Sequence, residues 1–511
     1  MKNSKHSNLN LIKIIFLLSL CYSLVMIALF INAPFHEEQS FRQSQTALTT
    51  YWLPITHQWF FYQTPVLGYP WTIPFEFPIY QWTVAIFHKI PMFNFLNLDG
   101  MGRAVSSMFM YLTLIPIYFL LKLFGFPKRT FYLAGTFFLA CPTVITWGGH
   151  IFLIESCILF LSLSYLTLAA YFLTSRHPIF LYSASLMGIL AIIGKVTTFT
   201  PAAVFVFVLL LMEVFKDLKA RNSKNIFALF ILKKYLLPAV LLFLFPLIAE
   251  VIWTHLADAL KSGNAVGATL TSKALFLFNF GTPSERVSLH ILFLLFLKKA
   301  LGIMPTYFIL IGLALYFRKK TQTPWPTLSL VFLLNYLSGP MIFTHLYLQE
   351  QYWFETAVYL ILGSTLLLEY LYLIDRTKLA TGLLIFTVLV QVAANNPPKF
   401  LRVHEQAWSD RDYQIGLFIR DHTPPNSFIL NHTDNWSSEI GYYAERKSFT
   451  GGSLEPLKNL SFYQGGLPLS AITFCGSPDG ATSLLSTLRS TYALTNVHEI
   501  EDCKIYYSNR S

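Results

Sequence analysis

Long apolar segments recur along most of the chain, and they constrain its fold more than any other feature. A helix that crosses a bilayer needs roughly 20 predominantly apolar residues. Only 12% of the 511 residues are charged, against about 25% in soluble proteins. The sequence therefore predicts an all-α polytopic membrane protein with about eleven transmembrane helices. The candidate spans are Leu11–Ile31, Val105–Phe124, Phe131–Thr146, Phe152–Leu173, Pro178–Ile193, Phe199–Phe215, Leu236–Trp253, Ile303–Phe317, Leu328–Phe343, Ala357–Leu373 and Ala380–Val392.

The basic residues between these segments predict the orientation of the chain. Cytoplasmic loops hold an excess of Lys and Arg, and with these spans every basic cluster falls on one side. We therefore expect a cytoplasmic amino terminus, with the loop Ala33–Asp99 and the tail after Asn395 outside. The net charge of +11 reflects this topology, and no basic patch on a folded soluble segment indicates nucleic-acid binding.

Four regions follow from this topology. Residues 1–33 form the cytoplasmic tail and first span, residues 34–102 a long external loop, residues 103–394 the helical core, and residues 395–511 a small external α/β domain. Within the loop, residues 38–56 and 79–90 have helical patterns that suit helices lying in the membrane interface. In the tail we expect a helix within Trp408–Arg420, a strand at SFIL, a further helix, and a closing strand at KIYYS.

Five cysteines occur in the chain, and two of them lie in the external tail. Cys475 and Cys503 would close a loop of about 29 residues if they form a disulfide in an oxidising compartment. Cys21, Cys141 and Cys157 lie in apolar segments, where a role as small core residues is favoured.

The external loop carries a density of charged and amide side chains that a simple connection between two spans does not require. It contains Glu37, Glu38, Arg42 and Glu76. Charged residues at membrane depth are costly and usually face a cavity or a partner. Three more groups at the outer ends of predicted spans are therefore of interest, namely Arg103, Glu155 and Lys195. By the predicted topology, all of these residues lie on the outer side.

Such a set of residues has the chemistry to act on a phosphate-linked lipid. Arg and Lys neutralise phosphate, and a neighbouring carboxylate can deprotonate an acceptor hydroxyl. Each of these residues can also be explained by a purely structural role. Arg103 could equally extend its head group to the interface from a helix end, Lys195 could anchor a helix there, His150 could be an interfacial histidine, and Glu37 a solvated neighbour of Glu38.

Several motifs resemble those of GT-C-fold glycosyltransferases, in particular bacterial relatives of protein O-mannosyltransferases and aminoarabinose transferases. They are QSFRQSQTA (Gln39–Ala47), PWTIPFEFPIYQW (Pro70–Trp82), the spacing of His150 and Glu155, and HLYLQEQYWFETAVYL (His345–Leu360). The resemblance covers roughly residues 35–360 and is weak in the tail. It implies an inverting transfer of a sugar from a polyprenyl-phosphate donor to a lipid, glycan or protein acceptor at the outer face of a bacterial inner membrane.

The resemblance also assigns roles to individual residues. Relatives use an Asp as base three residues before the arginine, where this chain has Gln39, so the adjacent Glu38 becomes the expected base. The sequence Glu76-Phe77-Pro78 lacks the lysine that relatives place after the glutamate, so Arg42, Arg103 or Lys195 must supply the charge on the donor phosphate. The expected substrate-binding residues are Arg42, Gln45, Glu76, Arg103, His150, Glu155, Lys195 and Tyr352.

Other functions stay open at this level. A lipid-linked glycan polymerase or ligase would more often carry its large loop late in the chain, and a transporter would show internal repeats. A relative that binds polyprenyl phosphate without catalysis is a further alternative. A divalent metal shared by Glu38, Glu76 and Glu155 is also open, although no ligand spacing requires one.

Overall fold

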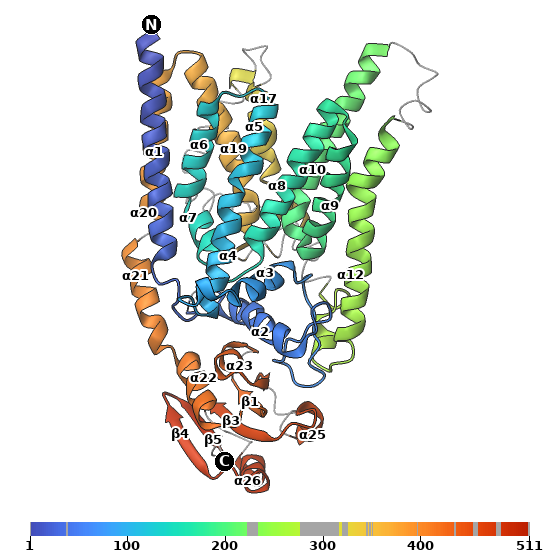
Figure 1. Ribbon diagram of the computed structural model, residues 1–511, viewed down its shortest axis with the longest axis vertical. Helices are drawn as coiled ribbons and strands as arrows, with labels where there is room; N and C mark the ends of the chain where they lie inside the picture. The colour runs from blue at the N-terminus through green and yellow to red at the C-terminus, as the bar shows by residue number, and fades with distance from the viewer. Residues whose placement is uncertain are drawn as a thin grey trace. The chain divides into compact units, whose positions relative to one another are not determined.

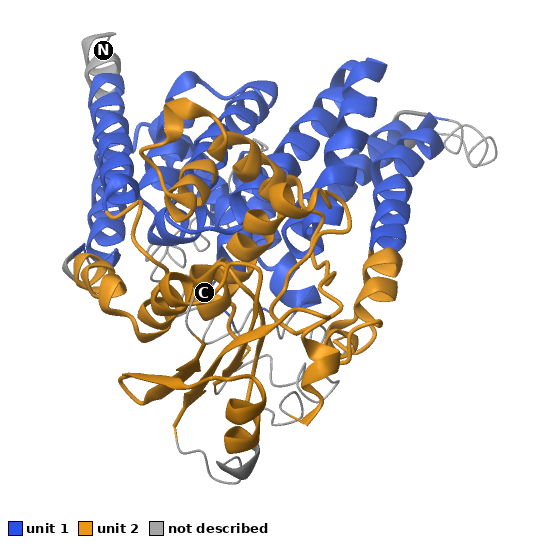
Figure 2. Cartoon of the chain, turned by 60° about the horizontal axis from the view of Figure 1, so that its bottom comes forward, with its two compact units in different colours: residues 1–29, 106–253, 276–397 blue, residues 30–105, 254–275, 398–511 orange. Residues whose placement is uncertain are grey.

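The computed structural model describes residues 2–36, 39–221, 234–275, 316–318, 325–343, 346, 349, 351–395, 397–433, 436–452, 458–476 and 482–508. The chain divides into two compact units (Figure 2). Unit 1 comprises Met1–Leu29, Ser106–Trp253 and Phe276–Pro397, and unit 2 comprises Phe30–Val105, Thr254–Leu275 and Pro398–Ser511. The predicted base Glu38 and most of the predicted span at residues 303–317 lie outside the described residues.

Unit 1 is built from helices. They are α1 (Lys2–Ala28), α5 (Leu114–Leu123), α6 (Lys128–Ala140), α7 (Pro142–Val144), α8 (Glu155–Ser175), α9 (Pro178–Gly194), α10 (Val196–Arg221), α17 (Trp325–Asn335), α18 (Ser338–Ile342), α19 (Gln351–Leu373) and α20 (Thr377–Ala394), with π-helical turns η2 (Ile145–Gly149) and η3 (Val240–Leu244). Three helices run from one unit into the other, namely α4 (Leu98–Leu112), α12 (Phe245–Lys261) and α21 (Pro397–Gln406).

Most of the predicted spans coincide with long apolar helices. Among the described residues, seven segments are long and apolar enough to cross a membrane, and an eighth results if α6 and residues 142–149, bent by 68°, form one span. The seven are Leu9–Ala28, Leu98–Leu123, Glu155–Ser175, Val196–Asp217, Lys234–Lys261, Gln351–Leu373 and Thr377–His422. Helices α9 and α17 are apolar but shorter. The chain is therefore a multi-pass membrane protein, and the count of eleven stays a prediction.

Helix α19 is the most deeply buried helix of unit 1 among those with a membrane-length sequence. It packs against α6 and α17, and its side chains are buried along almost the entire helix. Its two carboxylates, Glu355 and Glu369, are both fully buried. Each is paired with a cation: Glu355 with Lys195 and Glu369 with Arg129. Burying an unpaired charge would cost several kcal/mol, so these pairs allow α19 to keep charged residues.

Helices α8, α9 and α10 pack against one another (Figure 1). Two glycines of α9 permit the close approach of α8. A Cβ at Gly188 would lie 2.9 Å from the Tyr165 ring, and one at Gly194 would lie 2.2 Å from Ile158 Cδ1. A larger residue at Gly194 would require the Ile158 side chain to move. Because Lys195 follows Gly194 directly, this approach also brings Lys195 to the beginning of α8.

Unit 2 combines the first loop with the tail. Its helices are α2 (Ser40–Thr56), α3 (Ile79–His88), α22 (Arg411–His422), α23 (Glu439–Ala444), α25 (Leu460–Tyr463) and α26 (Thr482–Thr491), with short 3₁₀ turns η1 (Pro91–Phe93), η4 (Gly267–Leu270) and η6 (Ala407–Ser409). The strands are β1 (Phe428–His432), β2 (Lys447–Thr450), β3 (Leu469–Cys475), β4 (Asn496–Ile500) and β5 (Cys503–Tyr507). Helices α2 and α3 coincide with the helical patterns of the first loop, and the tail contains the small sheet that the sequence predicts. The position of the loop helices in a membrane interface stays a prediction.

The five strands form one mixed sheet with the order β2-β1-β3-β5-β4 (Figure 1). Strand β1 is parallel to β2 and β3, whereas β5 is antiparallel to β3 and β4. Successive side chains of a strand point to opposite faces, so Phe428 and Leu430 enter one apolar core and Ile429 enters the other. Both faces of the sheet are therefore covered.

The first loop completes the β2 edge of this sheet. The amides of Ser448 and Thr450 donate to the carbonyls of Pro65 and Val66, and Gly68 N donates back to Ser448 O. Gly68 has φ +74°, and a Cβ there would lie 2.7 Å from the Tyr463 ring. An edge strand is prone to pairing with another chain, and residues 65–68 occupy this edge within the same molecule.

The tail contains the predicted disulfide. Cys475 at the end of β3 and Cys503 at the beginning of β5 are bonded, with a sequence separation of 28 residues. These two residues are directly opposed in the antiparallel β3–β5 register. The bond therefore fixes the chain reversal through α26 and β4.

Candidate functional site

In unit 2, three of the predicted binding residues lie together. Arg42 Nη2 donates to Glu76 Oε1 at 2.9 Å, and Arg42 Nη1 donates to Gln45 Oε1 at 3.2 Å. We call Arg42, Gln45 and Glu76 the loop cluster. The Arg42 and Glu76 side chains are 28% and 23% exposed, so the pair is open to solvent or substrate. The cluster joins the two loop motifs that sequence analysis singled out.

Local structure explains how the loop cluster is held. Helix α2 begins at Ser40 after Gln39, whose backbone is left-handed with φ 72°, and Arg42 and Gln45 lie three residues apart on one face. On the other motif, the hydroxyl of Tyr62 donates to Glu76 O and accepts from Phe75 N. Burial raises the pKa of Tyr62 well above 10, so its hydroxyl stays protonated and keeps donating.

Gln45 has a further feature relevant to binding. Its side chain is 4% exposed. Its Oε1 accepts from Arg42, whereas its Nε2 is buried and has no acceptor within the described part of the chain. A buried donor without an acceptor costs about 1–3 kcal/mol. A substrate oxygen at this position would recover that free energy.

Arg103 has a different environment from the loop cluster. It is fully buried, and its Nη1 donates to the backbone carbonyls of Ile31 and Ala33. Its guanidinium also lies over the Phe35 ring, 5.4 Å from the centroid. Arg103 therefore fixes the chain where it enters the first loop, and this environment gives no support to its expected contact with substrate.

In unit 1, a second group of predicted residues lies together around Lys195. Lys195 Nζ is 2.7 Å from Glu155 Oε1 and 2.8 Å from Glu355 Oε1. The ammonium also lies 4.4 Å from the centroid of the Tyr352 ring. We call Glu155, Lys195, Tyr352 and Glu355 the lysine cluster. Burial alone would lower the pKa of Lys195, but Glu155 and Glu355 outweigh it and raise that pKa.

Two carboxylates around one ammonium give the lysine cluster a formal net charge of −1. Both Lys195 and Glu155 are less than 10% exposed. Glu155 Oε2 is buried and accepts no hydrogen bond from the residues that the structure describes. The cluster is therefore suited to accept a hydrogen bond or a proton, and it is poorly suited to attract a phosphate.

Glu355 is a member of this cluster that sequence reasoning missed. It is fully buried in α19, and it also accepts a hydrogen bond from Thr197 Oγ1 at 3.1 Å. Two sequence features indicate that Glu355 belongs to a site. A carboxylate in an apolar helix usually has a partner, and Glu355 follows Tyr352 by three residues, on the same helix face.

His150 belongs neither to the loop cluster nor to the lysine cluster. It is 1% exposed, and its Nε2 lies 2.9 Å from the carbonyl oxygen of Leu29 at the end of α1. Across the described residues, no group of three or more His, Cys, Asp or Glu side chains could hold a metal ion. Glu76 and Glu155 instead have Arg42 and Lys195 as partners.

Comparison with known proteins adds the fold family. No family model matches the chain, and no curated protein is significantly similar in sequence. The crystal structure of ArnT from Cupriavidus metallidurans bound to undecaprenyl phosphate aligns with a TM-score of 0.59 at 11% identity, over 96% of this chain and 97% of that chain. The apo state of the same enzyme aligns over the same shares with a TM-score of 0.55 and 12% identity.

An archaeal enzyme shows the same likeness. The apo oligosaccharyltransferase of Archaeoglobus fulgidus aligns with a TM-score of 0.51 at 13% identity, over 93% of this chain and 70% of that chain. Both enzymes have the GT-C fold. These alignments cover nearly the whole chain, including the tail, where the sequence motifs were weak. The chain therefore has the GT-C fold, as its sequence motifs predict.

Proposed function

We propose that the protein is a glycosyltransferase of a bacterial plasma membrane that transfers a sugar from a polyprenyl-phosphate donor. The acceptor is a lipid, a glycan or a protein on the extracytoplasmic face. The GT-C fold and the likeness to an enzyme crystallised with undecaprenyl phosphate support this proposal. The observation that carries it is the loop cluster, in which Arg42 is held by Glu76 beside the buried amide of Gln45.

The transfer is a single displacement. Glu38 takes the proton of the acceptor hydroxyl, and the hydroxyl oxygen forms a bond to the anomeric carbon of the sugar. The bond between that carbon and the phosphate oxygen breaks, and its electron pair leaves with the polyprenyl phosphate. Attack opposite to the leaving group inverts the anomeric configuration. A positioned base of this kind contributes about 10²–10⁴-fold to the rate.

Among the three cations expected to contact donor phosphate, Arg42 is best suited. Arg103 is fully buried on backbone carbonyls, and Lys195 lies between two carboxylates. The Arg42 guanidinium is partly exposed, and its planar fork matches phosphate oxygens. A phosphate that binds Arg42 would compete with Glu76, while Gln45 Nε2 would donate to a second oxygen of the substrate.

The lysine cluster is assigned to substrate hydroxyl groups. Glu155 Oε2 is a buried acceptor, and Lys195 holds Glu155 and Glu355 in place from the turn between α9 and α10. Tyr352 packs against the ammonium and restricts its position. This assignment uses the negative net charge of the cluster, which favours a hydroxyl donor over a phosphate.

The proposal is tested with the purified full-length protein in nanodiscs and radiolabelled polyprenyl-phosphate sugars, with cell-envelope fractions as acceptors. We expect Glu38→Gln to reduce transfer by about 10²–10⁴-fold, with little change in affinity for undecaprenyl phosphate. Arg42→Ala should weaken that affinity. Glu37→Gln is the matched control, because it removes the neighbouring carboxylate, and it should leave transfer unchanged. Full transfer by both Glu38→Gln and Arg42→Ala would show that the loop is not the active centre.

A further inference from the structure

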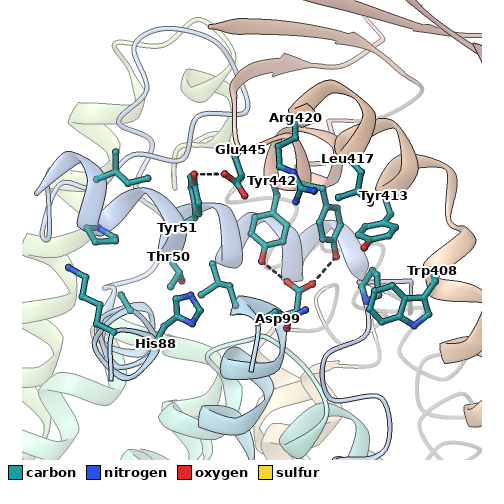
Figure 3. Close-up of a pocket in the computed structure, with 18 residues that line it drawn as sticks. Thr50, Tyr51, His88, Asp99, Trp408, Tyr413, Leu417, Arg420, Tyr442 and Glu445 are labelled. Carbon is teal, nitrogen blue, oxygen red and sulfur yellow. Dashed lines mark hydrogen bonds between the residues drawn. The ribbon is translucent and has the colours of Figure 1, made fainter. Parts of the chain in front are cut away.

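A cavity of about 460 Å³ lies within unit 2, apart from the loop cluster (Figure 3). Helix α2 and the ends of α3 and α4 line it from the first loop, and α22 and α23 line it from the tail. We propose that this cavity binds a saccharide, namely the sugar part of the acceptor. The assignment to the acceptor rests on the proposed function, whereas the saccharide chemistry follows from the lining.

Aromatic side chains form one wall of this cavity. Trp408 is 48% exposed, and its ring lies 5.9 Å from that of Tyr413 at an interplanar angle of 78°. Figure 3 shows both rings on the same side of the cavity. Sugar rings present flat faces of C–H groups, and these faces pack on aromatic rings. An indole that is half exposed at a cavity is suited to such packing.

Carboxylates supply the polar contacts that a sugar requires. Asp99 is 4% exposed and accepts hydrogen bonds from the hydroxyls of Tyr442 and Tyr443. Glu445 accepts from the Tyr51 hydroxyl at 2.9 Å. Its left-handed backbone, with φ 55°, ends helix α23. Figure 3 shows Asp99 and Glu445 as two separate acceptors along the cavity.

The charge balance of the lining favours a neutral, hydroxyl-rich ligand. Asp99 and Glu445 contribute two negative charges, and Lys89 and Arg420 contribute two positive charges, so the lining has no net charge with His88 neutral. A phosphate would need a positive excess, and a lipid chain would not need four charged groups. The volume lies in the range of about 300–1,000 Å³ that small-molecule sites occupy.

The test measures saccharide binding directly, without the transfer reaction. Full-length protein in nanodiscs is mixed with a panel of methyl glycosides of hexoses, N-acetylhexosamines and uronic acids, and binding is read by saturation-transfer-difference NMR and by titration. A second arm offers a glycolipid inserted in the nanodisc. We expect at least one neutral saccharide to bind, with Trp408→Ala weakening its affinity about tenfold or more and Trp408→Phe retaining most of it.

Phe462→Ala is the matched control, because Phe462 is 49% exposed in unit 2 and is not part of the cavity lining. It should bind saccharide as the wild type does. Binding in either arm that depends on Trp408 supports the site, and the stronger arm identifies the carrier of the sugar. The absence of a saccharide signal, or a signal that Trp408→Ala does not change, overturns it. If Glu38→Gln loses transfer and no saccharide binds, the proposed function stands and this saccharide site is wrong. If saccharide binding depends on Trp408 but the protein has no transferase activity, the saccharide site stands and the proposed function is wrong.

Discussion

Lys195 Nζ lies 2.8 Å from Glu355 Oε1, which joins the turn between α9 and α10 to the most deeply buried helix of unit 1. The same ammonium contacts Glu155 at the beginning of α8. One lysine thus connects three parts of the helical core, and the close α8–α9 approach at Gly194 places it there.

Lys195→Met should lower the free energy of unfolding by about 3–5 kcal/mol, because it leaves two buried carboxylates without their cation. Adding Glu355→Gln to this variant should recover part of the loss. Thermal unfolding in detergent measures both effects. Lys122→Met replaces an exposed lysine of α5 and should change the unfolding temperature little. An equal effect of Lys195→Met and Lys122→Met would show that the pairing does not stabilise the fold.

Glu76→Gln should tighten the binding of undecaprenyl phosphate up to about tenfold, or 1.4 kcal/mol, because it removes the carboxylate that competes for Arg42. The partly exposed Arg42–Glu76 pair contributes only about 0–1 kcal/mol to stability, so thermal unfolding should change little. Titration of the lipid into nanodisc-embedded protein measures the affinity. Weaker binding by Glu76→Gln would instead identify Glu76 as a group that positions Arg42 for the donor.

The stability of unit 2 should depend on pH through Glu439. Burial and the nearby carboxylates of Asp412 and Asp410, against a hydrogen bond from Ser40, together raise the pKa of Glu439 from 4.5 to about 8. Between these pH values the folded state holds a proton that the unfolded chain has lost. The free energy of unfolding should therefore fall as pH rises from about 4.5 to 8, by up to about 1.4 kcal/mol per pH unit.

Glu439→Gln should remove this pH dependence, because the amide does not titrate, and should stabilise the protein at pH 8.5 relative to the wild type. Unfolding midpoints at pH 5 and 8.5 measure the effect. Glu499→Gln is the control, since the Glu499 side chain is 63% exposed. Identical pH profiles for the wild type and Glu439→Gln would contradict the prediction.

Loss of the Cys475–Cys503 bond should destabilise the tail by about 2–4 kcal/mol, because the unfolded chain regains the freedom of the closed loop. The double variant Cys475→Ser/Cys503→Ser and reduction of the wild type should give the same loss of unfolding temperature. Cys21→Ser, which removes an exposed free thiol, should have no effect. A wild type that is insensitive to reductant would show that the bond adds nothing to stability.

Periodicity predicted most elements correctly. The apolar segments predict the long helices because span length and hydrophobicity are local properties, and SFIL and KIYYS predict β1 and β5 because short runs of apolar and aromatic residues favour strands. The pairing of Cys475 with Cys503 was also accessible, since both cysteines lie in the predicted external tail, where an oxidising compartment favours a disulfide.

What could not be predicted depends on contacts between distant residues. The pairing of Glu355 with Lys195 rather than with another cation could not be predicted, because it requires the packing of α19 near α8 and α10. The contacts of Arg103 with the backbone carbonyls of Ile31 and Ala33 could not be predicted either, because main-chain acceptors carry no residue-specific signal. The pairing of the first loop with the sheet of the tail could not be predicted either. The hydrogen bonds from Ser448 and Thr450 to the loop involve main-chain groups, which are the same in every residue type.

The pairing of residues 65–68 with β2 can form only late in the synthesis of the chain. Pro65 and Ser448 are separated by 383 residues, and a ribosome that adds about 5–20 residues per second needs roughly 20–80 s to make that length. The loop is therefore translated long before its partner strand exists, and during this interval its main-chain groups are exposed to other chains. The β2 edge of the sheet can therefore close only after the tail has been synthesised.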